Sequence, residues 1–563
     1  MGILIIFTMS LEKFIDYSNV LSLFIFIILV IHINKSDYLD KSNLKKYMLI
    51  SIFFGLIFLI GNCCYINRYS NNDSIWNYLF NWKSIICIIG YSMLFYLILI
   101  SIIPKVSKID IFNKVKKENC NNKILLKTFI IIFVCWIPYF LIYYPGLFSS
   151  DSISEITMIV NGDFNDHHTV IHLLFCLIPY KIGMFIFKSE TIAASLITLF
   201  QMATMAIIYA YTIKFLSNRK ISKKILILIL LYFAVLPVHA YYSITIWKDV
   251  IFSGCVLLLT LELIKLLEKK QLTIKNSYSF IIVSIITILF RNNAIYMYVL
   301  LAIVTVVVFR KNLKTILLML LIVFGTYGFI KGPVYNQFNI KKSSSSEYIA
   351  IPLQQIGRMA YKDVKFTKYE KKMINKIIPI NILKEKYNPE IVDSIKFNEN
   401  YNITAFEENK FKYLKLWIGL CVDNFGIATE SYLISTLGYW YPNVNYWSVF
   451  TSVEKNDLNI KESGIINNEI KNYVNLLTKR SIPLYGLIWS IGLCIWIIII
   501  SIVMILSKKN KKSLYVFVPI IGIWLSLMVA TPVFAEFRYM YCAFTTLPIL
   551  LLSYRILNHE LND

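Results

Sequence analysis

Charged residues are scarce in this chain: Asp, Glu, Lys and Arg together make up only 16% of its 563 residues. Soluble globular chains carry about 25% charged residues, so this low share excludes an ordinary soluble domain. The aromatic share of 15% excludes a fibrous or disordered chain. Hydrophobic residues account for 57% of the chain and gather in long runs, which predicts an integral membrane protein.

Acidic residues and paired cysteines are also few. Lys and Arg outnumber Asp and Glu by 57 to 33, which gives a net charge of +24. In a soluble chain this excess would indicate nucleic-acid binding, but the cytoplasmic loops of membrane proteins also collect Lys and Arg. We therefore expect membrane lipids, and no nucleic acid, as partners. The ten cysteines include no C-x-x-C pair, and Cys421 is alone in the largest polar segment, which argues against a disulfide framework there.

About thirteen apolar runs approach or reach the roughly 17 to 25 residues that a helix needs to cross a bilayer. Runs of this length favour helices over barrel strands, because each backbone polar group in hydrocarbon needs a partner within a closed element. We therefore expect an all-α polytopic membrane protein. The expected spans are 18–33, 47–65, 84–104, 125–143, 192–216, 225–238, 250–267, 278–290, 294–309, 315–330, 483–506, 514–534 and 537–557.

Basic residues set the expected orientation. Six basic connections fall on one side if these spans alternate across the membrane, and the positive-inside rule makes that side the cytoplasm. The protein then lies in the cell membrane with its N-terminus outside the cell and its C-terminus in the cytoplasm. The residues are Lys35, Lys41, Lys45 and Lys46; Lys105, Lys108, Lys114, Lys116, Lys117, Lys123 and Lys127; Arg219, Lys220, Lys223 and Lys224; Lys269, Lys270 and Lys275; Arg310, Lys311 and Lys314; and Lys508, Lys509, Lys511 and Lys512.

The stretches between the spans divide the chain into four parts. Residues 1–124 hold N-terminal spans, 125–330 a transmembrane core whose first outer loop covers 144–190, and 481–563 the C-terminal spans. Residues 331–480 are polar and mixed in charge, so we expect an extracytoplasmic domain there, with a flexible run at 341–346. We expect the apolar stretch 168–187 to lie along or dip into the outer membrane surface, because counting it as a span would move the basic residues at 219–224 outside.

Polar residues that are unusual at a membrane boundary collect on the outer side of this topology. Charges there are costly unless they are paired or used, so the sequence predicts one site at this face. Its candidates are Asp151, His167 and His168 in the first outer loop; Trp247, Lys248 and Asp249 in the next turn; Arg291 and Asn292 in a third; and Glu536 and Arg538 in the last.

Each candidate also has a structural interpretation. An arginine such as Arg291 can extend to the lipid headgroups, Glu536 and Arg538 can form a structural ion pair, and His167-His168 can be a solvated loop. Asp151 follows a Pro-Gly turn at the outer end of a span, where a carboxylate can act as a base or as a cation ligand. The sequence does not identify metal-ligating residues. If a divalent cation binds, we expect Mg²⁺ or Mn²⁺, and we expect no other cofactor.

Five segments between about Tyr144 and Pro548 resemble the recurring segments of a known family. That family consists of uncharacterised bacterial multi-pass membrane proteins related to the GT-C glycosyltransferases, which use lipid-linked sugars. The chain departs from that family at Glu155, where Gln is usual, and at Thr169, where Pro is expected. The segments are Tyr144-Pro145-Gly146 with Asp151-Ser152 and His167-His168; Thr245 to Phe252; Arg291-Asn292-Asn293; Ile351-Pro352-Leu353-Gln354-Gln355; and Glu536-Phe537-Arg538-Tyr539.

The resemblance implies a GT-C-like helical core, a catalytic Asp151 and a polyprenyl-phosphate sugar as donor. It implies a hexosyltransferase whose acceptor is an envelope glycan, lipid or protein outside the cytoplasm. The residue chemistry agrees, since Asp151 can take the proton of the acceptor hydroxyl and cations can stabilise the leaving phosphate. The available cations are Lys248, Arg291 and Arg538, with the His pair as a further phosphate or cation contact. The aromatic residues Trp247, Tyr439, Trp440 and Tyr441 can stack on sugars or belong to an ordinary aromatic belt.

Two other functions compete with transfer. A transporter or flippase of lipid-linked glycans would place ionisable residues near the bilayer midplane and show inverted repeats. Neither feature is evident in the sequence. A non-catalytic envelope assembly protein would tolerate substitution of Asp151, and the sequence does not exclude it. The sugar, the acceptor and the oligomeric state have no signal in the sequence.

Overall fold

The computed structural model describes residues 43–112, 122–269, 271–341, 349–482, 484–508 and 510–559. Within these ranges the chain forms helices joined by loops, with isolated β-bridges and no strand. The expected span 18–33, most of the expected flexible run 341–346, and several basic residues of the expected cytoplasmic loops lie outside the described residues. Those basic residues are Lys35, Lys41, Lys114, Lys116, Lys117, Lys270 and Lys509.

Nine helices in the described ranges are long and apolar enough to cross a membrane, and the bent pair α10 and α11 makes up to ten. This finding confirms the prediction of an all-α multi-pass membrane protein. The nine are α3 (Leu44–Asn67), α5 (Trp82–Lys108), α6 (Asn122–Ile142), α8 (Val170–Phe187), α9 (Glu190–Ser217), α12 (Lys248–Glu268), Arg310–Gln337 with α15 (Leu313–Phe329), Lys512–Ala530 with α26 (Val518–Ala530), and Phe537–His559 with α27 (Tyr541–His559).

Five further apolar helices in the described ranges are too short to meet that length alone. Helices α10 (Lys223–Val235) and α11 (Pro237–Ile244) meet at a bend of 48°. Pro237 stands at the start of α11, where its missing N–H breaks the helical ladder. The others are α13 (Ile274–Phe290), α14 (Ala294–Val308) and α25 (Ile491–Leu506).

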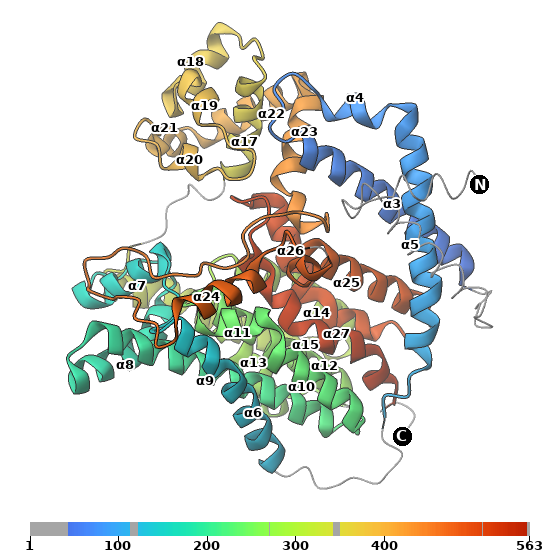
Figure 1. Cartoon of the computed structure of the whole chain (residues 1–563), viewed down its shortest axis with the longest axis vertical. Helices are drawn as coiled ribbons and strands as arrows, with labels where there is room; N and C mark the ends of the chain where they lie inside the picture. Colours follow the sequence, from blue (N-terminus) through green and yellow to red (C-terminus); the bar gives the residue numbers. More distant parts are fainter. Residues whose placement is uncertain are drawn as a thin grey trace.

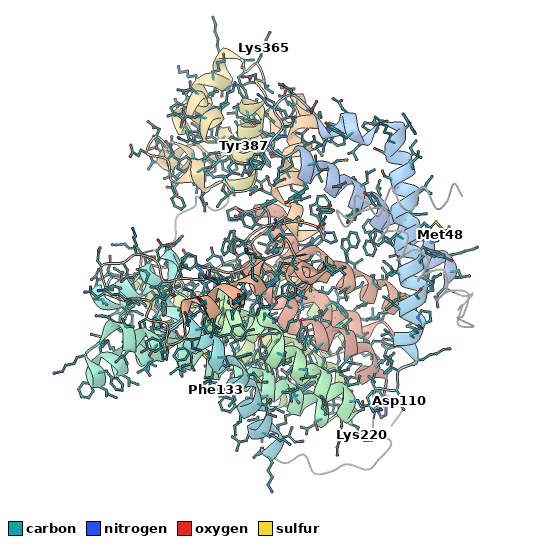
Figure 2. The ribbon with its side chains drawn as sticks, in the orientation of Figure 1. Met48, Asp110, Phe133, Lys220, Lys365 and Tyr387 are labelled. Carbon is teal, nitrogen blue, oxygen red and sulfur yellow. The ribbon has the colours of Figure 1, made fainter. Side chains whose placement is uncertain are left out.

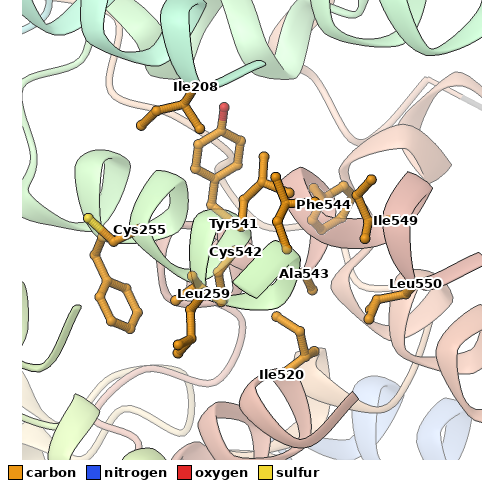
Figure 3. Packing of buried hydrophobic residues seen from close by; sticks show 14 of the residues in the cluster. Ile208, Cys255, Leu259, Ile520, Tyr541, Cys542, Ala543, Phe544, Ile549 and Leu550 are labelled. Atoms are coloured by element: carbon orange, nitrogen blue, oxygen red, sulfur yellow. The ribbon is translucent and has the colours of Figure 1, made fainter. Parts of the chain in front are cut away.

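Helix α12 is the centre of the molecule. Its sequence is apolar on all sides, and a helix of that kind is buried among other helices; 83% of its most apolar window is buried. It packs against α27, α13 and α9. Figure 3 shows Cys255 and Leu259 beside Tyr541 and Cys542 of the last span. Helix α12 carries Asp249 in its first turn and so fixes one side of the candidate site.

The basic connections gather at one end of the bundle. Ser222 donates its backbone N–H to the carbonyl of Ile111 at 2.8 Å, which joins two of these connections. Arg555 of the last span donates to the carbonyl of Ile109 at 2.7 Å, and Lys220 lies close to Asp110 in Figure 2. The structure therefore brings the ends of α5, α9 and α27 to one face, as the predicted alternation requires.

Helix α8 begins and ends at the opposite face. Thr169, before its first residue, donates its hydroxyl to the carbonyl of Phe290 at 2.9 Å. Thr191, just beyond its end, donates to the carbonyl of Asn459, a residue of the loop that pairs with the first outer loop. Both ends of α8 are therefore tied to segments at the face that holds the first outer loop, although α8 is long and apolar enough to cross a membrane. That 168–187 lies along or dips into the outer membrane surface stays a prediction.

The expected extracytoplasmic domain is helical and divides into two parts. Residues 349–428 have a hydrophobic core of their own and form a helical subdomain, seen above the bundle in Figure 1. Residues 437–482, with α24 (Asn468–Asn475), pack on the bundle instead. The helices that build the subdomain are α17 (Ala350–Tyr361), α18 (Lys368–Ile377), α19 (Ile380–Lys386), α20 (Asp393–Lys396), α21 (Ile403–Glu408), α22 (Lys410–Asp423) and α23 (Phe425–Ser435).

A buried ion pair ties this subdomain to the first spans. Arg358 of α17 and Glu430 of α23 are both fully buried and bonded to each other. Arg358 also donates to the carbonyl of Arg68 at 2.5 Å, and Ser74 donates to Glu430 at 3.2 Å. Arg68 and Ser74 lie in the connection between α3 and α5, so the pair joins three separate parts of the chain.

Replacing Arg358 with Ala should destabilise the protein strongly, because it leaves the Glu430 carboxylate buried with Lys362 as its remaining cation. Breaking a buried pair in this way typically costs about 3–5 kcal/mol. The midpoint of thermal unfolding in detergent measures the effect. Lys384→Ala is the matched control, since the Lys384–Asp363 pair is largely exposed and exposed pairs contribute about 0–1 kcal/mol. Equal shifts for the two variants would contradict this account.

Candidate functional site

The first outer loop is held in place by backbone pairing with two distant segments. Leu147 pairs with Thr245 before α12, and Phe148 pairs with Val453 of the long outer loop. Gly146 has φ +135°, and a Cβ there would lie 2.3 Å from the Thr198 hydroxyl of α9. Only glycine adopts this conformation at so close an approach without strain. The loop then enters α7 (Ser150–Asn161) and presents Asp151 in its first turn.

Asp151 forms an ion pair with Arg538, which is 387 residues away in sequence. Arg538 Nη1 lies 2.5 Å from Asp151 Oδ2. Burial acts to raise the pKa of Asp151, but the Arg538 guanidinium prevails and holds that pKa below its usual value. The Asp151 side chain keeps 39% of its surface exposed, so the ionised carboxylate is open to a ligand.

A second ion pair stands beside the first. Arg291 Nη1 lies 3.2 Å from Asp249 Oδ1. The Arg291 guanidinium is 4.9 Å and that of Arg538 is 5.4 Å from the centre of the Tyr539 ring, so one aromatic ring separates the two cations. Arg538 also lies 4.9 Å from the ring of Trp247. The structure therefore brings Asp151, Asp249, Arg291 and Arg538, predicted from four separate turns, into one cluster.

Glu536 supplies a third carboxyl group to this cluster. Its Oε1 lies 3.5 Å from Arg538 Nε, too far for a hydrogen bond of good geometry. Burial raises the pKa of Glu536 to about 7, although Arg538 and Arg480 act to lower it. A carboxyl group with this pKa changes its protonation state near neutral pH.

Arg480 is a cluster residue that the sequence reasoning did not single out. It donates to the Ser448 hydroxyl at 3.2 Å and lies 5.6 Å from the Phe537 ring. Burial lowers its pKa to about 10, and its Nη2 atom makes no hydrogen bond within the described residues. In the sequence it is one arginine just before a span, a position that usually indicates contact with headgroups, so its pattern carries no distinguishing signal.

Lys248, His167 and Asn292 lie at one edge of the cluster. Lys248 donates to the carbonyl of His167 at 2.8 Å, and its charge acts on Asp151. Asn292 donates to the carbonyl of Asp166 at 2.7 Å. Lys331 then bonds to both oxygens of the Asp166 carboxylate, at 2.7 and 2.8 Å. These bonds fix the far end of the first outer loop, so Asn292 acts there as a positioning group.

His168 belongs to a separate buried group around Glu155. The Nδ1 atom of His172 is 2.6 Å and that of His168 is 3.3 Å from the Glu155 carboxylate, and Cys176 lies 3.9 Å from the other ring nitrogen of His172. Burial acts to raise the pKa of Glu155, but the two histidines hold it well below its usual range. In the sequence Glu155 stood out only as a departure from a family pattern.

The metal-ligand grouping found among the described residues is Glu155, His172 and Cys176. A donor set with imidazole and thiol suits zinc-like ions, whereas Mg²⁺ and Mn²⁺ prefer oxygen ligands. For an oxygen-preferring cation the fitting group is Asp151, whose carboxylate is partly exposed and has one oxygen outside the bond to Arg538. The divalent cation itself stays a prediction.

The aromatic candidates differ in how much of each side chain is exposed. Tyr439 and Tyr441 are fully buried and have no free ring face for a sugar, and Trp440 is partly buried against the second core cluster. Trp247 supports Arg538, and its indole N–H donates to Ser149 at 2.7 Å. Trp447, which is 41% exposed and lies 6.2 Å from Trp247, has an open ring surface near the cluster.

This arrangement can bind an anion and accept a proton. Lys248, Arg291, Arg480 and Arg538 supply positive charge, while Asp151 and Glu536 supply an ionised and a titratable carboxyl group. Guanidinium groups bind phosphate oxygens with strong, directional hydrogen bonds. Because Asp151 is open on one side, an anion held by Arg538 would lie within reach of its carboxylate.

Comparison with known proteins assigns the chain to a protein family. No curated protein and no solved structure matches it. One family, described as a family of unknown function (DUF6020), matches residues 161–561. That range contains α8 to α27, with the turns that carry Trp247, Arg291 and Arg538, and it begins at the last residue of α7, so it leaves out Asp151. Since the match covers well over half of its length, this chain belongs to the DUF6020 family.

Proposed function

We propose that this protein is a membrane glycosyltransferase of the GT-C type. It transfers a hexosyl group from a polyprenyl-phosphate donor to an envelope glycan, lipid or protein outside the cytoplasm. The observation that carries the proposal is the Asp151–Arg538 pair at 2.5 Å, at the centre of a cluster of cations and carboxyl groups. A site for this reaction needs a phosphate-binding cation and a proton acceptor side by side, and the pair supplies both.

The donor phosphate would bind to the arginines. Arg538 is held on the Trp247 ring and Arg291 on the Tyr539 ring, so both guanidinium groups are oriented before a ligand arrives. Lys248 stands at the rim with its amine on the His167 carbonyl. Preoriented cations stabilise a leaving phosphate without reorganisation in the transition state.

Donor binding would also activate the base. In the free protein Arg538 neutralises Asp151 and lowers its pKa, which weakens it as a base. A phosphate that takes hydrogen bonds from Arg538 relieves that effect and restores the basicity of the carboxylate. The acceptor hydroxyl oxygen then attacks the anomeric carbon and its proton passes to Asp151. The bond from that carbon to the phosphate oxygen breaks, and the electron pair leaves with the polyprenyl phosphate.

A divalent cation such as Mg²⁺ or Mn²⁺ is the alternative use of Asp151 in this proposal. In that case Asp151 would hold the ion through the carboxylate oxygen that Arg538 leaves open, and it would not serve as the base. When bound, the ion would add positive charge at the leaving phosphate. Arg291, Arg480 and Arg538 provide the phosphate contacts that belong to the chain itself.

One observation favours the alternative of transport. His239 of α11 is fully buried beside the bend in the α10–α11 pair, where its Nδ1 lies 3.0 Å from the Tyr541 hydroxyl and 3.3 Å from that of Tyr209. An ionisable residue inside a membrane protein is a common element of proton and substrate pathways. Translocation of a lipid-linked glycan by proteoliposomes, lost in His239→Phe and retained in Asp151→Asn, would favour transport over transfer.

Replacing Asp151 with Asn should abolish transfer while the protein still folds and inserts. An amide cannot accept the acceptor's proton, and loss of a general base typically costs about 100- to 10,000-fold in rate. The measurement is transfer of labelled sugar from a polyprenyl-phosphate donor by purified protein, with thermal unfolding as a folding check. Asp163→Asn, an exposed carboxylate of the same loop, is the matched control. Near-normal turnover in the Asp151 variant would make its role structural.

The titration of Glu536 should appear in donor binding. Glu536 is neutral below its pKa of about 7 and becomes negative above it, which places a repelling charge beside Arg538. The phosphodiester of the donor stays singly charged over this range, so the KM for the donor should rise about tenfold between pH 6 and pH 8. Glu536→Gln keeps position 536 neutral at every pH, so the KM of this variant for the donor should not change between pH 6 and pH 8. The same slope in the Gln variant would assign the titration to another group.

We place the site on the extracytoplasmic face, because the basic connections gather at the opposite end of the bundle. A cysteine at Lys365 of the subdomain should then react with a membrane-impermeant thiol reagent in intact cells. A cysteine at Lys220 should react only after permeabilisation. Both positions are exposed in the structure, so accessibility in the folded protein does not distinguish them. Labelling of the Lys220 variant in intact cells would reverse the orientation.

A further inference from the structure

The helical subdomain contains an apolar cavity that the proposed reaction does not use. It has a volume of about 390 Å³, within the range typical of small-molecule sites. Its walls come from α17, α18 and α22, and Lys410 is the one charged residue among those that line it. Val529, at the end of α26, closes one side. The cavity therefore lies between the subdomain and the outer end of a membrane span.

Helix α22 carries an apolar stripe that leads to this cavity. Its exposed apolar residues recur every three or four positions, the spacing of one helix face. On α22 they run from Phe411, which is 87% exposed, through Leu414 and Ile418 to Val422, and Phe425 at the start of α23, which is 71% exposed, continues the row. Phe411 and Leu414 also line the cavity. The stripe and the cavity thus form one continuous apolar surface.

The stripe lies at the level of the outer membrane boundary. Trp76, in the connection between spans α3 and α5, donates its indole N–H to the carbonyl of Gly426 at 3.0 Å, one residue beyond the stripe. Phe80 and Trp82 in the same connection are 84% and 66% exposed, as expected of aromatic residues at a membrane interface. An apolar stripe of this size beside that interface faces lipid and not water.

From this continuity we propose that the subdomain cavity binds the hydrocarbon chain of a bilayer lipid. The chain passes from the outer leaflet along the α22 stripe, between Phe411 and Leu414, and lies against Trp417 and the isoleucines of α18. An anionic headgroup stays at the mouth, where Lys410, Lys412 and Lys415 of α22 attract it. The proposal stands on the cavity and the stripe and does not rest on the transferase proposal.

The cavity is connected to the charge cluster by a short segment. Val392 donates its N–H to the carbonyl of Pro532 at 3.0 Å, and Phe534 donates to that of Glu390 at 2.9 Å. This pairing fixes the eight-residue segment from Val529 to Glu536, whose ends lie at most about 25 Å apart when it is extended. A lipid with its chain in the cavity would therefore have its headgroup on the same side of the molecule as Asp151 and Arg538.

Photocrosslinking in lipid nanodiscs tests this site. The purified full chain is reconstituted in phosphatidylcholine and phosphatidylglycerol with a phospholipid that carries a diazirine at the end of one acyl chain. After irradiation, mass spectrometry should find adducts on the cavity walls, at Ile374–Leu383 and Phe406–Trp417, besides those on the spans. Adducts on the spans alone would overturn the proposal.

Two tryptophan substitutions on α22 separate the cavity from general lipid contact. Leu414→Trp fills the mouth and should reduce the Ile374–Leu383 adducts on the order of tenfold, the effect of losing about 1.4 kcal/mol of binding. Val422→Trp lies on the same stripe but outside the cavity and should leave those adducts unchanged. Span adducts report folding in both variants. Equal adduct yields in the two variants would show that no chain enters the cavity.

A competition arm identifies the source of the chain. Addition of a polyprenyl phosphate that reduces the cavity adducts would show that the cavity accepts an isoprenoid chain, as a lipid-linked donor carries. Unchanged adducts would assign it to phospholipid. Either result supports a hydrocarbon-chain site. Because the readout is binding and not transfer, it is independent of the outcome of the Asp151→Asn assay.

Discussion

The cost of leaving a charge without a partner at a membrane boundary governs the outer half of this protein. Asp151 and Arg538 meet that constraint together, at 2.5 Å, although they are 387 residues apart. Their contact requires the first outer loop, the start of α12 and the last turn before α27 to come to one place. The backbone pairing of Leu147 with Thr245 and of Phe148 with Val453 fixes the loop in that position.

The subdomain and the cluster are mechanically linked through the segment that precedes Glu536. That segment pairs with Glu390 and Val392 on one side and continues directly into Phe537 and Arg538 on the other. The Arg358–Glu430 pair fixes the subdomain to the connection between α3 and α5. A ligand that shifted the subdomain would therefore act on the position of Arg538 through one short stretch of backbone. Rigid elements joined in this way can transmit small displacements between sites.

Hydropathy and spacing predicted the helical membrane class and most span positions, because apolar length is a local property of the chain. They also indicated that outer-turn residues such as Asp151, Asp249, Arg291 and Arg538 share one site, since topology alone brings those turns to one face. Which charged side chains contact one another depends on the tertiary structure, and the sequence did not predict those pairs. It did not distinguish His168, which joins the buried Glu155 group, from the residues around the Asp151–Arg538 pair. It also missed Arg480, whose position before a span looks like an ordinary boundary arginine, and the Arg358–Glu430 pair.

The hydrogen bonding of the cluster argues for a ligand and against a purely structural ion network. Structural networks of buried charges are stable when each member is satisfied, since an unmet group in a low-dielectric site is expensive. Here Arg480 Nη2 makes no hydrogen bond within the described part of the chain, and Arg538 Nε has only the Glu536 carboxylate at 3.5 Å, too far for a good hydrogen bond. Both atoms are guanidinium nitrogens, which only donate, and both cations act on Glu536. A phosphate oxygen is an acceptor that could satisfy both donors. A proton on Glu536 would then remove the repulsion between its carboxylate and that phosphate, which is the state that its raised pKa favours.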